Sequence, residues 1–462
     1  KILYNDAVAM TGGQPVDGGT SVDAIARQVE SEGVAQVVVL SDDIGKYASI
    51  KGRFPAGTEF HERHALDEVQ RRLREIPGVT VLIYEQTCAA EKRRRRKKGE
   101  LADPPKRLFI NDAVCEGCGD CSMQSNCVAV LPHETPLGRK RRIDQSACNK
   151  DYRCLDGFCP SFVSVSGGKP RRHSGLLDSQ REAFLQRVQA LPLPPAIEGP
   201  GPYDLLVTGV GGTGVVTVGA LITMAAHLEG LHASVLDFMG FAQKGGAVMS
   251  FVRVAREEAM LNQARIDAQQ CDAVLACDLV VAAAPEALQT MSRGRTRVLA
   301  NTHPTPVAES VRNPDAQLHV PALLAKLHFA VGRERVQTFD AQALALDFLG
   351  DTMTANIVAL GYAWQRGLVP VGLAALRRAI ELNGVAVATN HLAFALGRLA
   401  AAQPQALAAL REPGTTGDDR GAEELPALLE RARVLLSAWG NRAWAERFAR
   451  TLHDVQAREA AL

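Results

Sequence analysis

The sequence predicts an α/β protein with two α/β regions, a cysteine-dense segment between them and a helical tail. Short runs rich in Val and Ile alternate with stretches of helical apolar spacing, both in the first hundred residues and after position 200. Seven of the ten cysteines lie between positions 115 and 159. From about Thr352 the chain is rich in Ala and Leu, which predicts mainly helix.

The first hundred residues predict alternating strands and helices. Runs of β-branched residues indicate buried parallel strands, and the stretches between them have the spacing of amphipathic helices. The expected strands are 2–4, 35–40 and 79–84, and the expected helices are 22–31 and 64–75. Residues 91–107 are basic, polar and contain proline, which predicts a connector.

A Pro- and Gly-rich linker at 191–202 precedes the second α/β region. A strand at 203–207, a glycine-rich turn and an apolar helix from about Val215 open that region. Further strands are expected at 233–238, 248–254, 279–283 and 297–300. A spacer at 412–423 precedes one last amphipathic helix, 425–452, whose aromatic residues Trp439, Trp444 and Phe448 we expect to form a packing face. The sequence shows no internal repeat.

Composition limits the kinds of partner that we expect. A hydrophobic fraction of 46% and a charged fraction of 22% are those of a soluble globular protein. No apolar run reaches the roughly 18 to 20 residues that cross a bilayer. The net charge of +1 gives no general attraction to nucleic acid or membranes. The first residues lack a signal peptide and an initiator Met, so we expect a cytoplasmic protein whose N-terminal part is missing.

The spacing of the cysteines predicts an iron–sulfur cluster. A C-x2-C-x2-C run lets three thiolates bind three irons of one cubane, and a remote cysteine followed by proline supplies the fourth ligand. By that logic Cys159, which precedes Pro160, completes the site of the first three cysteines. The candidate ligands are Cys115, Cys118, Cys121, Cys159, Cys127, Cys148 and Cys154.

Other interpretations of these cysteines stay open. Zinc or a set of buried thiols would also use clustered cysteines, although zinc usually takes paired C-x2-C knuckles. A second cluster has only three cysteines, because Cys127, Cys148 and Cys154 remain after the first site is complete. Cys88 is a candidate for the missing ligand or an ordinary half-buried thiol. Cys271 lies, with Cys277, in an apolar stretch where buried thiols are expected.

Two glycine-containing loops follow predicted strands. Residues 209–214 satisfy G-x-G-x-x-G, and Asp237 lies near the spacing of a ribose-binding carboxylate, which predicts NAD or FAD binding. In residues 5–14, an Asn side chain and a backbone carbonyl two residues later could share a hard cation, and Gly12 and Gly13 would let N–H groups approach a phosphate. Asn-Asp and Gly-Gly are also ordinary turn residues.

The second of these loops resembles the magnesium–thiamine diphosphate loop of the 2-oxoacid:ferredoxin oxidoreductases. The resemblance implies that Asn5 gives Mg²⁺ its side-chain oxygen and Ala7 its carbonyl, while Thr11 and Gly12 lie near the diphosphate. The Gly-Asp-Gly that supplies the family's first metal carboxylate is absent, and it would precede Lys1. We name no catalytic acid or base, because the family's activating glutamate is expected in a domain absent from this chain.

The resemblance extends to the fused bacterial indolepyruvate ferredoxin oxidoreductases. It rests on residues 81–88, 93–98, 115–121, 143–152 and 157–160, and on 209–214 and 390–394, which are similar to the γ-type domain. It implies the C-terminal half of a thiamine-diphosphate-binding domain at 1–100, a ferredoxin-like iron–sulfur insert at 101–190, a Rossmann-like γ domain at 200–405 and a helical tail at 422–462. In that family the glycine-rich turn has a packing or substrate-side role.

The resemblance implies oxidative decarboxylation of an aryl 2-oxo acid to the acyl-CoA. Electrons would pass through one or two [4Fe-4S] clusters to ferredoxin, with thiamine diphosphate and Mg²⁺ as further cofactors. Coenzyme A, the oxo acid and ferredoxin are the implied partners of a homo-oligomer, and the isolated fragment is expected to be inactive. The alternatives are an NAD-linked dehydrogenase with a ferredoxin-like insert and a non-catalytic electron-transfer module.

Two further features have alternative interpretations. Residues 91–98 carry seven consecutive basic side chains after Glu91, which predicts either a solvated linker or a surface that steers an acidic ferredoxin or binds coenzyme A phosphates. We expect His61 and His64 to be surface or helix-start residues, not bases.

Overall fold

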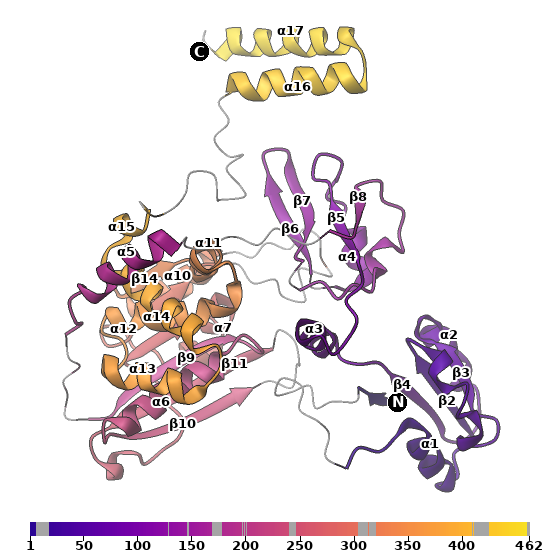
Figure 1. Ribbon diagram of the computed structural model, residues 1–462, viewed down its shortest axis with the longest axis horizontal. Helices are drawn as coiled ribbons and strands as arrows, with labels where there is room; N and C mark the ends of the chain where they lie inside the picture. The colour runs from indigo at the N-terminus through magenta and orange to yellow at the C-terminus, as the bar shows by residue number, and fades with distance from the viewer. Residues whose placement is uncertain are drawn as a thin grey trace. The chain divides into compact units, whose positions relative to one another are not determined.

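The computed structural model describes most of the chain, and the residues form two compact units, Lys1–Pro404 and Gln405–Leu462 (Figure 1). The described residues are 1–5, 18–127, 129–145, 147–168, 178–195, 197, 199, 201–239, 246–303, 313, 320–408, 410 and 425–459. Each unit is described by itself.

Four parallel strands form the first sheet. Their order is β1-β4-β2-β3. The strands are β1 (Ile2–Tyr4), β2 (Gln36–Ser41), β3 (Glu59–Glu62) and β4 (Thr80–Glu85). The three strands predicted from apolar runs are confirmed. The edge strand β3 was not predicted, because its sequence Glu-Phe-His-Glu is mostly polar.

Helices cover both faces of this sheet. Helix α1 (Val22–Ser31) packs in the apolar cluster that contains Val37 and Val39, whereas α2 (Leu66–Leu73) packs with Val38 and Leu40 of the same strand. Successive side chains of a strand point to opposite faces. Both faces of β2 are therefore buried, which explains its continuous apolar sequence.

Glu59 ties β3 to α2. Its carboxylate accepts a 2.9 Å hydrogen bond from Arg72 Nη1 and lies 2.9 Å from His61 Nε2. Hydrogen bonding to Arg72 lowers the pKa of Glu59 to about 2, although burial opposes the shift. An unfolded glutamate titrates near ~4.3. The stabilisation is therefore complete above that pH and is lost as the pH falls through about 2.

We expect Glu59→Gln to lower the melting temperature at neutral pH, with a difference from the parent chain that shrinks steadily below about pH 4.3. Thermal unfolding followed by circular dichroism between neutral pH and about pH 2 measures that difference. Asp67→Asn, which removes the partner of Arg71 on the exposed side of α2, is the control. A difference that is independent of pH would contradict the assignment.

The predicted connector after the first sheet is partly wrong, because its basic run is helix α3 (Ala89–Lys98), which ends at Gly99 with φ 77°. Arg and Lys are good helix formers, and Glu91 pairs with Arg94 and Arg95 one turn later. The following segment contains two antiparallel strand pairs and short helices. Its elements are β5 (Lys106–Ile110) with β8 (Phe162–Ser166), β6 (Val130–Thr135) with β7 (Gly138–Ile143), α4 (Asp120–Ser125) and the 3-10 helix η5 (Arg153–Leu155).

The second sheet has six strands in the order β10-β11-β9-β12-β13-β14. The strands β9, β12, β13 and β14 are parallel, whereas β11 is antiparallel to both β9 and β10. The strands are β9 (Tyr203–Val210), β10 (His232–Met239), β11 (Ala247–Ala255), β12 (Ala273–Ala276), β13 (Arg297–Asn301) and β14 (Val336–Phe339). Strands β12 and β14 were not predicted.

The strand predicted at 279–283 is wrong, because these residues begin helix α7 (Leu279–Ala282). Asp278 starts the helix, since its carboxylate accepts a 2.9 Å hydrogen bond from the backbone N–H of Val281. The chain between β9 and β10 is α6 (Val215–Leu228), as predicted. The other α-helices described in this unit are α5 (Asp178–Gln189), α8 (Pro285–Leu288), α10 (Val320–Val331), α11 (Ala341–Leu349), α12 (Ala355–Gln365), α13 (Leu373–Asn383) and α14 (Val387–Ala402). Helix α15 (Pro404–Ala408) begins at the last residue of this unit.

Two glycines let helices α12 and α14 touch through their backbones. A Cβ atom at Gly361 would lie 2.1 Å from the carbonyl oxygen of Phe394, and one at Gly397 would lie 1.9 Å from that of Val358. Only glycine fits at such a crossing. The predicted helical character after Thr352 is thus confirmed, and residues 390–394 lie within α14.

The second unit contains α16 (Leu425–Trp439) and α17 (Arg442–Glu459), so the prediction of one helix at 425–452 is wrong. Asn441 starts α17, because its side-chain oxygen accepts a 3.1 Å hydrogen bond from the N–H of Trp444. The Trp444 side chain is 63% exposed and Phe448 is half-buried, so most of the Trp444 side chain lies outside the packing of this unit. The side chain of Trp439, the third predicted packing residue, lies outside the described part of the chain.

Candidate metal centre

The first cysteine loop is shaped by glycines. Cys115 and Cys121 are buried and Cys118 is exposed. Gly117 has φ 73°, and a Cβ atom there would lie 2.1 Å from the carbonyl oxygen of Arg139. The N–H of Gly117 donates to Cys115 Sγ at 3.4 Å. Hydrogen bonds to cysteine sulfur are a feature of iron–sulfur sites, where they tune the cluster.

The second cysteine loop contains the same kind of bond. The N–H of Lys150 donates to Cys148 Sγ at 3.4 Å. Cys154 follows as the second residue of η5, and Cys148, Cys154 and Cys127 are all half-buried. The two loops meet, because helix α4 of the first contacts η5 of the second.

The thiols form two groups. The pKa of Cys121 is raised to about 11, mainly by burial and also by the neighbouring Cys115 and Cys118. Burial raises the pKa of Cys154 to about 12, with further contributions from Cys148, Cys127 and Cys121. Three predicted ligands of the first site therefore lie near one another, and so do the three remaining cysteines.

A buried cation lies beside these thiols. The Arg141 side chain of β7 is 1% exposed, and its charge opposes the rise in the pKa of Cys121. A fixed positive charge offsets the negative charge of thiolate ligands, and the net charge near a cluster is one determinant of its reduction potential. The donor set of this segment therefore suits an iron–sulfur cluster in both chemistry and electrostatics.

In the part of the chain that the structure describes, no three His, Cys, Asp or Glu side chains are close enough to hold one metal ion together. Each thiolate of a cubane binds its own iron, so the ligands of a cubane are more widely spaced than those of one ion. The predicted fourth ligand Cys159 lies 3.0 Å from Ser161 Oγ through its sulfur. Cys88 lies outside both loops, directly before α3.

Helix α3 supports the second loop. Arg93 Nη1 donates to the carbonyl oxygen of Ala147 at 3.0 Å, and Arg96 Nη1 donates to that of Asn149 at 2.8 Å. Lys92 pairs with Asp42, and Arg94 and Arg95 pair with Glu91. Much of the basic run is therefore engaged in contacts within the chain, so it is not simply a solvated linker.

Asn5, the first residue of the predicted cofactor loop, lies directly after β1 at the carboxyl edge of the first sheet. The other predicted residues of this loop, Ala7, Thr11 and Gly12, lie outside the described residues. The carboxyl edge also carries Glu85, which pairs with Lys46 at 2.7 Å. Ligands of α/β sheets bind outside the carboxyl ends of parallel strands.

His61 lies in strand β3, and His64 lies in the 3-10 helix Arg63–Ala65 directly before α2. The side chain of His61 is 36% exposed, so His61 is a surface residue of a strand, and His64 is a helix-start residue. Cys271 and Cys277 are 0% and 5% exposed, which confirms the prediction of buried thiols.

The glycine-rich turn at 209–214 is packed inside the second sheet region. A Cβ atom at Gly209 would lie 2.4 Å from Val215 Cγ2. Asn356 of α12 donates to the carbonyl oxygen of Thr213 at 2.7 Å and to its hydroxyl at 3.1 Å. Gly214 has φ 92° and directly precedes α6. These contacts favour a packing role for the turn.

The strand order argues against a dinucleotide at this turn. In a dinucleotide-binding unit, the strand after the first helix is parallel to the first strand and lies beside it. Here β11 lies between β9 and β10 and is antiparallel to both. Neighbouring strands are about 4.8 Å apart, so Asp237 of β10 lies two strand spacings from the turn's own strand.

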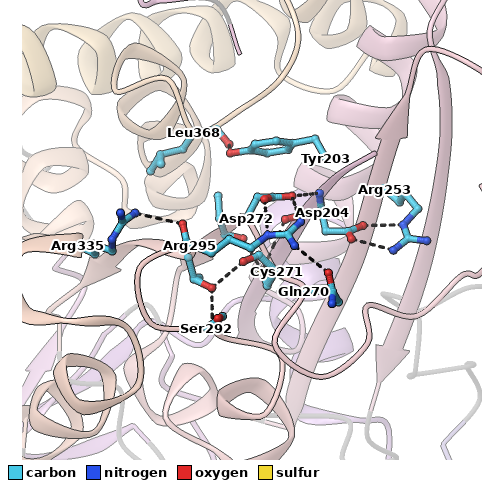
Figure 2. Close-up of polar contacts among 12 residues, drawn as sticks. Tyr203, Asp204, Arg253, Gln270, Cys271, Asp272, Ser292, Arg295, Arg335 and Leu368 are labelled. Atoms are coloured by element: carbon cyan, nitrogen blue, oxygen red, sulfur yellow. Dashed lines mark hydrogen bonds and ion pairs between the residues drawn. The ribbon is translucent and has the colours of Figure 1, made fainter. Parts of the chain in front are cut away.

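A polar network lies at the amino ends of the parallel strands of the second sheet, opposite to the end that carries the glycine-rich turn (Figure 2). Asp204, at the start of β9, accepts two hydrogen bonds from Arg253, and its own N–H donates to Asp272 Oδ2 at 2.9 Å. Arg295 donates to Asp272 Oδ1 at 2.8 Å. These groups lie at the amino ends of β9 and β12, away from the edge where α/β sheets bind ligands, which indicates a structural role.

Residues 204–400 match the family model described as pyruvate ferredoxin/flavodoxin oxidoreductase. The chain is 29% identical over 161 residues to indolepyruvate oxidoreductase subunit IorB of Methanothermobacter thermautotrophicus, covering 35% of this chain and 77% of that protein. It is 27% identical over 208 residues to IorB of Pyrococcus horikoshii, covering 43% of this chain and 96% of that protein.

Among solved structures, the chain is similar to pyruvate oxidoreductase subunit PORC of Thermotoga maritima, with 19% identity and a TM-score of 0.32. The similarity covers 43% of this chain and 96% of that one. Among the described helices, none combines the length and the apolar character needed to span a bilayer.

Proposed function

We propose that the chain belongs to the 2-oxoacid:ferredoxin oxidoreductases and that it oxidises an aryl 2-oxo acid such as indolepyruvate to the acyl-CoA. The family match over residues 204–400 supports this proposal. The cysteine segment would hold [4Fe-4S] clusters, which would supply electron transfer to ferredoxin. The aryl substrate class is supported by the curated relatives, whose names give indolepyruvate.

The main support for this proposal is the arrangement of the cysteine thiols. Two groups of three cysteines lie close enough for their charges to interact, and Cys121 and Cys154 connect the groups. Each loop directs a backbone N–H at the sulfur of its first cysteine, Cys115 or Cys148. Two neighbouring clusters would let electrons move one at a time from the oxo acid to ferredoxin. Cys159 is the proposed fourth ligand of the first cluster.

Thiamine diphosphate with Mg²⁺ would supply the carbanion chemistry of decarboxylation. Asn5 would give the metal a side-chain oxygen and Ala7 a carbonyl oxygen, while Thr11 and Gly12 would approach the diphosphate through backbone N–H groups. The place of Asn5 at the carboxyl edge of a parallel sheet supports this role.

The parts of the chain have distinct proposed roles. Residues 1–100 form the C-terminal part of a thiamine-diphosphate-binding domain, 101–190 carry the clusters, and 200–405 form a γ-type domain followed by a helical tail at 422–462. The γ-type domain packs by means of the turn at 209–214 and binds no dinucleotide. We propose that the protein is cytoplasmic and acts as a homo-oligomer.

An EPR experiment on the anaerobically purified natural protein tests this function. Indolepyruvate with coenzyme A is expected to produce the signal of a reduced cluster, and ferredoxin is expected to remove it. NADH in place of the oxo acid is expected to produce no signal. If dithionite reduces the clusters but the oxo acid does not, the protein is not an indolepyruvate oxidoreductase.

A further inference from the structure

The two cysteine loops match position by position. Cys115 and Cys121 of the first loop correspond to Cys148 and Cys154 of the second, with the same spacing within each loop. The middle ligand of the first loop, Cys118, corresponds to Asp151. The second loop therefore reads C-x2-D-x2-C.

The backbones of the loops match as well. Gly117 and Gly119 have φ 73° and 79°, and the corresponding Lys150 and Tyr152 have φ 53° and 61°. Both loops donate an N–H to the sulfur of their first cysteine at 3.4 Å. In both loops the second left-handed residue directly precedes a short helix, α4 or η5, whose second residue is the third cysteine or its counterpart.

The left-handed backbone of the second loop is informative because the residues that adopt it, Lys150 and Tyr152, are not glycines. Glycine adopts φ > 0 readily, but Lys and Tyr do so at an energetic cost. Such strain persists where the surrounding structure requires one backbone path, and it concentrates at functional sites. The second loop keeps the path of the first without its glycines, which indicates that it serves the same purpose.

Asp151 is placed to act as a ligand. Its carboxylate is 34% exposed, and it stands between Cys148 and Cys154 at the position that Cys118 has in the first loop. Its polar contacts are long, since Arg63 Nη2 lies 3.9 Å away and Asn149 Nδ2 and the N–H of Arg153 lie 3.4 Å away. Hydrogen bonds of such length are weak, so these contacts leave the carboxylate available.

We propose that Asp151 is the fourth ligand of a second [4Fe-4S] cluster, together with Cys127, Cys148 and Cys154. A carboxylate oxygen of Asp151 would bind one iron, and each of the three cysteines would release its thiol proton on binding its own iron. Asp151 thereby takes the place for which Cys88 was the candidate. The inference rests on the proposed iron–sulfur clusters.

Carboxylate oxygen is a harder donor than thiolate, and iron in clusters prefers thiolate. The iron at Asp151 is therefore the most easily removed of its cluster. Mild oxidation of the natural protein is expected to convert this cluster, and not the first, to a three-iron form with its own EPR signal.

Substitutions at Asp151 test the assignment by iron and sulfide analysis and by EPR. In Asp151→Ala, one iron per chain is expected to be lost from the anaerobically purified protein, and added ferricyanide is expected to oxidise the remaining three-iron cluster by one electron to the form that gives its EPR signal. In Asp151→Cys, the full iron content is expected, with a cluster that resists oxidative loss of iron. Asp156→Ala, which removes the exposed partner of Arg153, is the control and is expected to match the natural protein.

The outcomes distinguish the assignment of Asp151 as a ligand from the proposed function of the protein. If Asp151→Ala keeps its iron content and spectrum, and Asp151→Cys resists oxidation no better than the natural protein, Asp151 is not a ligand, although the proposed function stands. A natural protein without cluster iron and sulfide would overturn the proposed function itself. If Asp151→Ala fails to fold, the comparison of Asp151→Cys with the natural protein decides the assignment.

Discussion

Replacing Asp204 with alanine is expected to lower the free energy of unfolding by about 3–5 kcal/mol, because it leaves the Arg253 guanidinium buried without its partner. Arg253 Nε donates to Asp204 Oδ1 at 2.7 Å and Nη2 donates to Oδ2 at 2.8 Å. The two side chains are 6% and 2% exposed. The hydrogen bond to Asp204 raises the pKa of Arg253 in the natural chain. An Arg guanidinium stays protonated in proteins even without such a partner, so the variant keeps a buried positive charge.

Urea unfolding followed by circular dichroism measures this loss. Glu381→Ala, which removes the exposed partner of Arg378 in α13, is the matched control and is expected to change the free energy of unfolding by less than about 1 kcal/mol. A loss of similar size in both variants would show that the buried pair is no more important than a surface pair. Asn262, which accepts a 3.2 Å hydrogen bond from Arg253 Nη1, cannot replace the lost negative charge.

Replacing Cys121 with alanine is expected to remove the first cluster and to abolish reduction of ferredoxin by the oxo acid. Cys121 lies near Cys115 and Cys118, and it is also close to Cys154 of the second group. Loss of this ligand interrupts the proposed path of electrons at the point where the two groups meet. Iron analysis and EPR of the reduced protein measure the number of clusters that remain.

Cys271→Ala is the matched control, because burial raises the pKa of Cys271 to about 12, much as it raises that of Cys121 to about 11. The groups that surround the Cys271 thiol differ from those around Cys121. Cys271 donates to the carbonyl oxygen of Ala273 at 3.0 Å and lies near Asp204 and Asp272, with no second thiol among its main charge interactions. Full cluster content is expected in this variant. Equal loss of iron from both variants would contradict the assignment of Cys121.

Local sequence predicted those elements whose residues are buried on both faces or follow a clear helical period. Strand β2 and helix α1 are examples, since their apolar patterns result directly from their packing. Strand β3 was not predicted, because three of its four residues are polar. An ion pair, not an apolar face, attaches it to α2. Residues 279–282 read as a strand, but the carboxylate of Asp278 starts a helix there.

The sequence by itself determined the chemistry available to this protein: the number and spacing of its cysteines, the Asn that follows a strand, and the glycines that open α6. Only the tertiary structure decided which groups meet. It separated Asp237 from the glycine-rich turn by inserting β11, and it gave the loop around Asp151 the backbone path of the loop around Cys118. The physical reason is that strand order and left-handed backbone angles depend on contacts between distant residues, which local spacing does not encode.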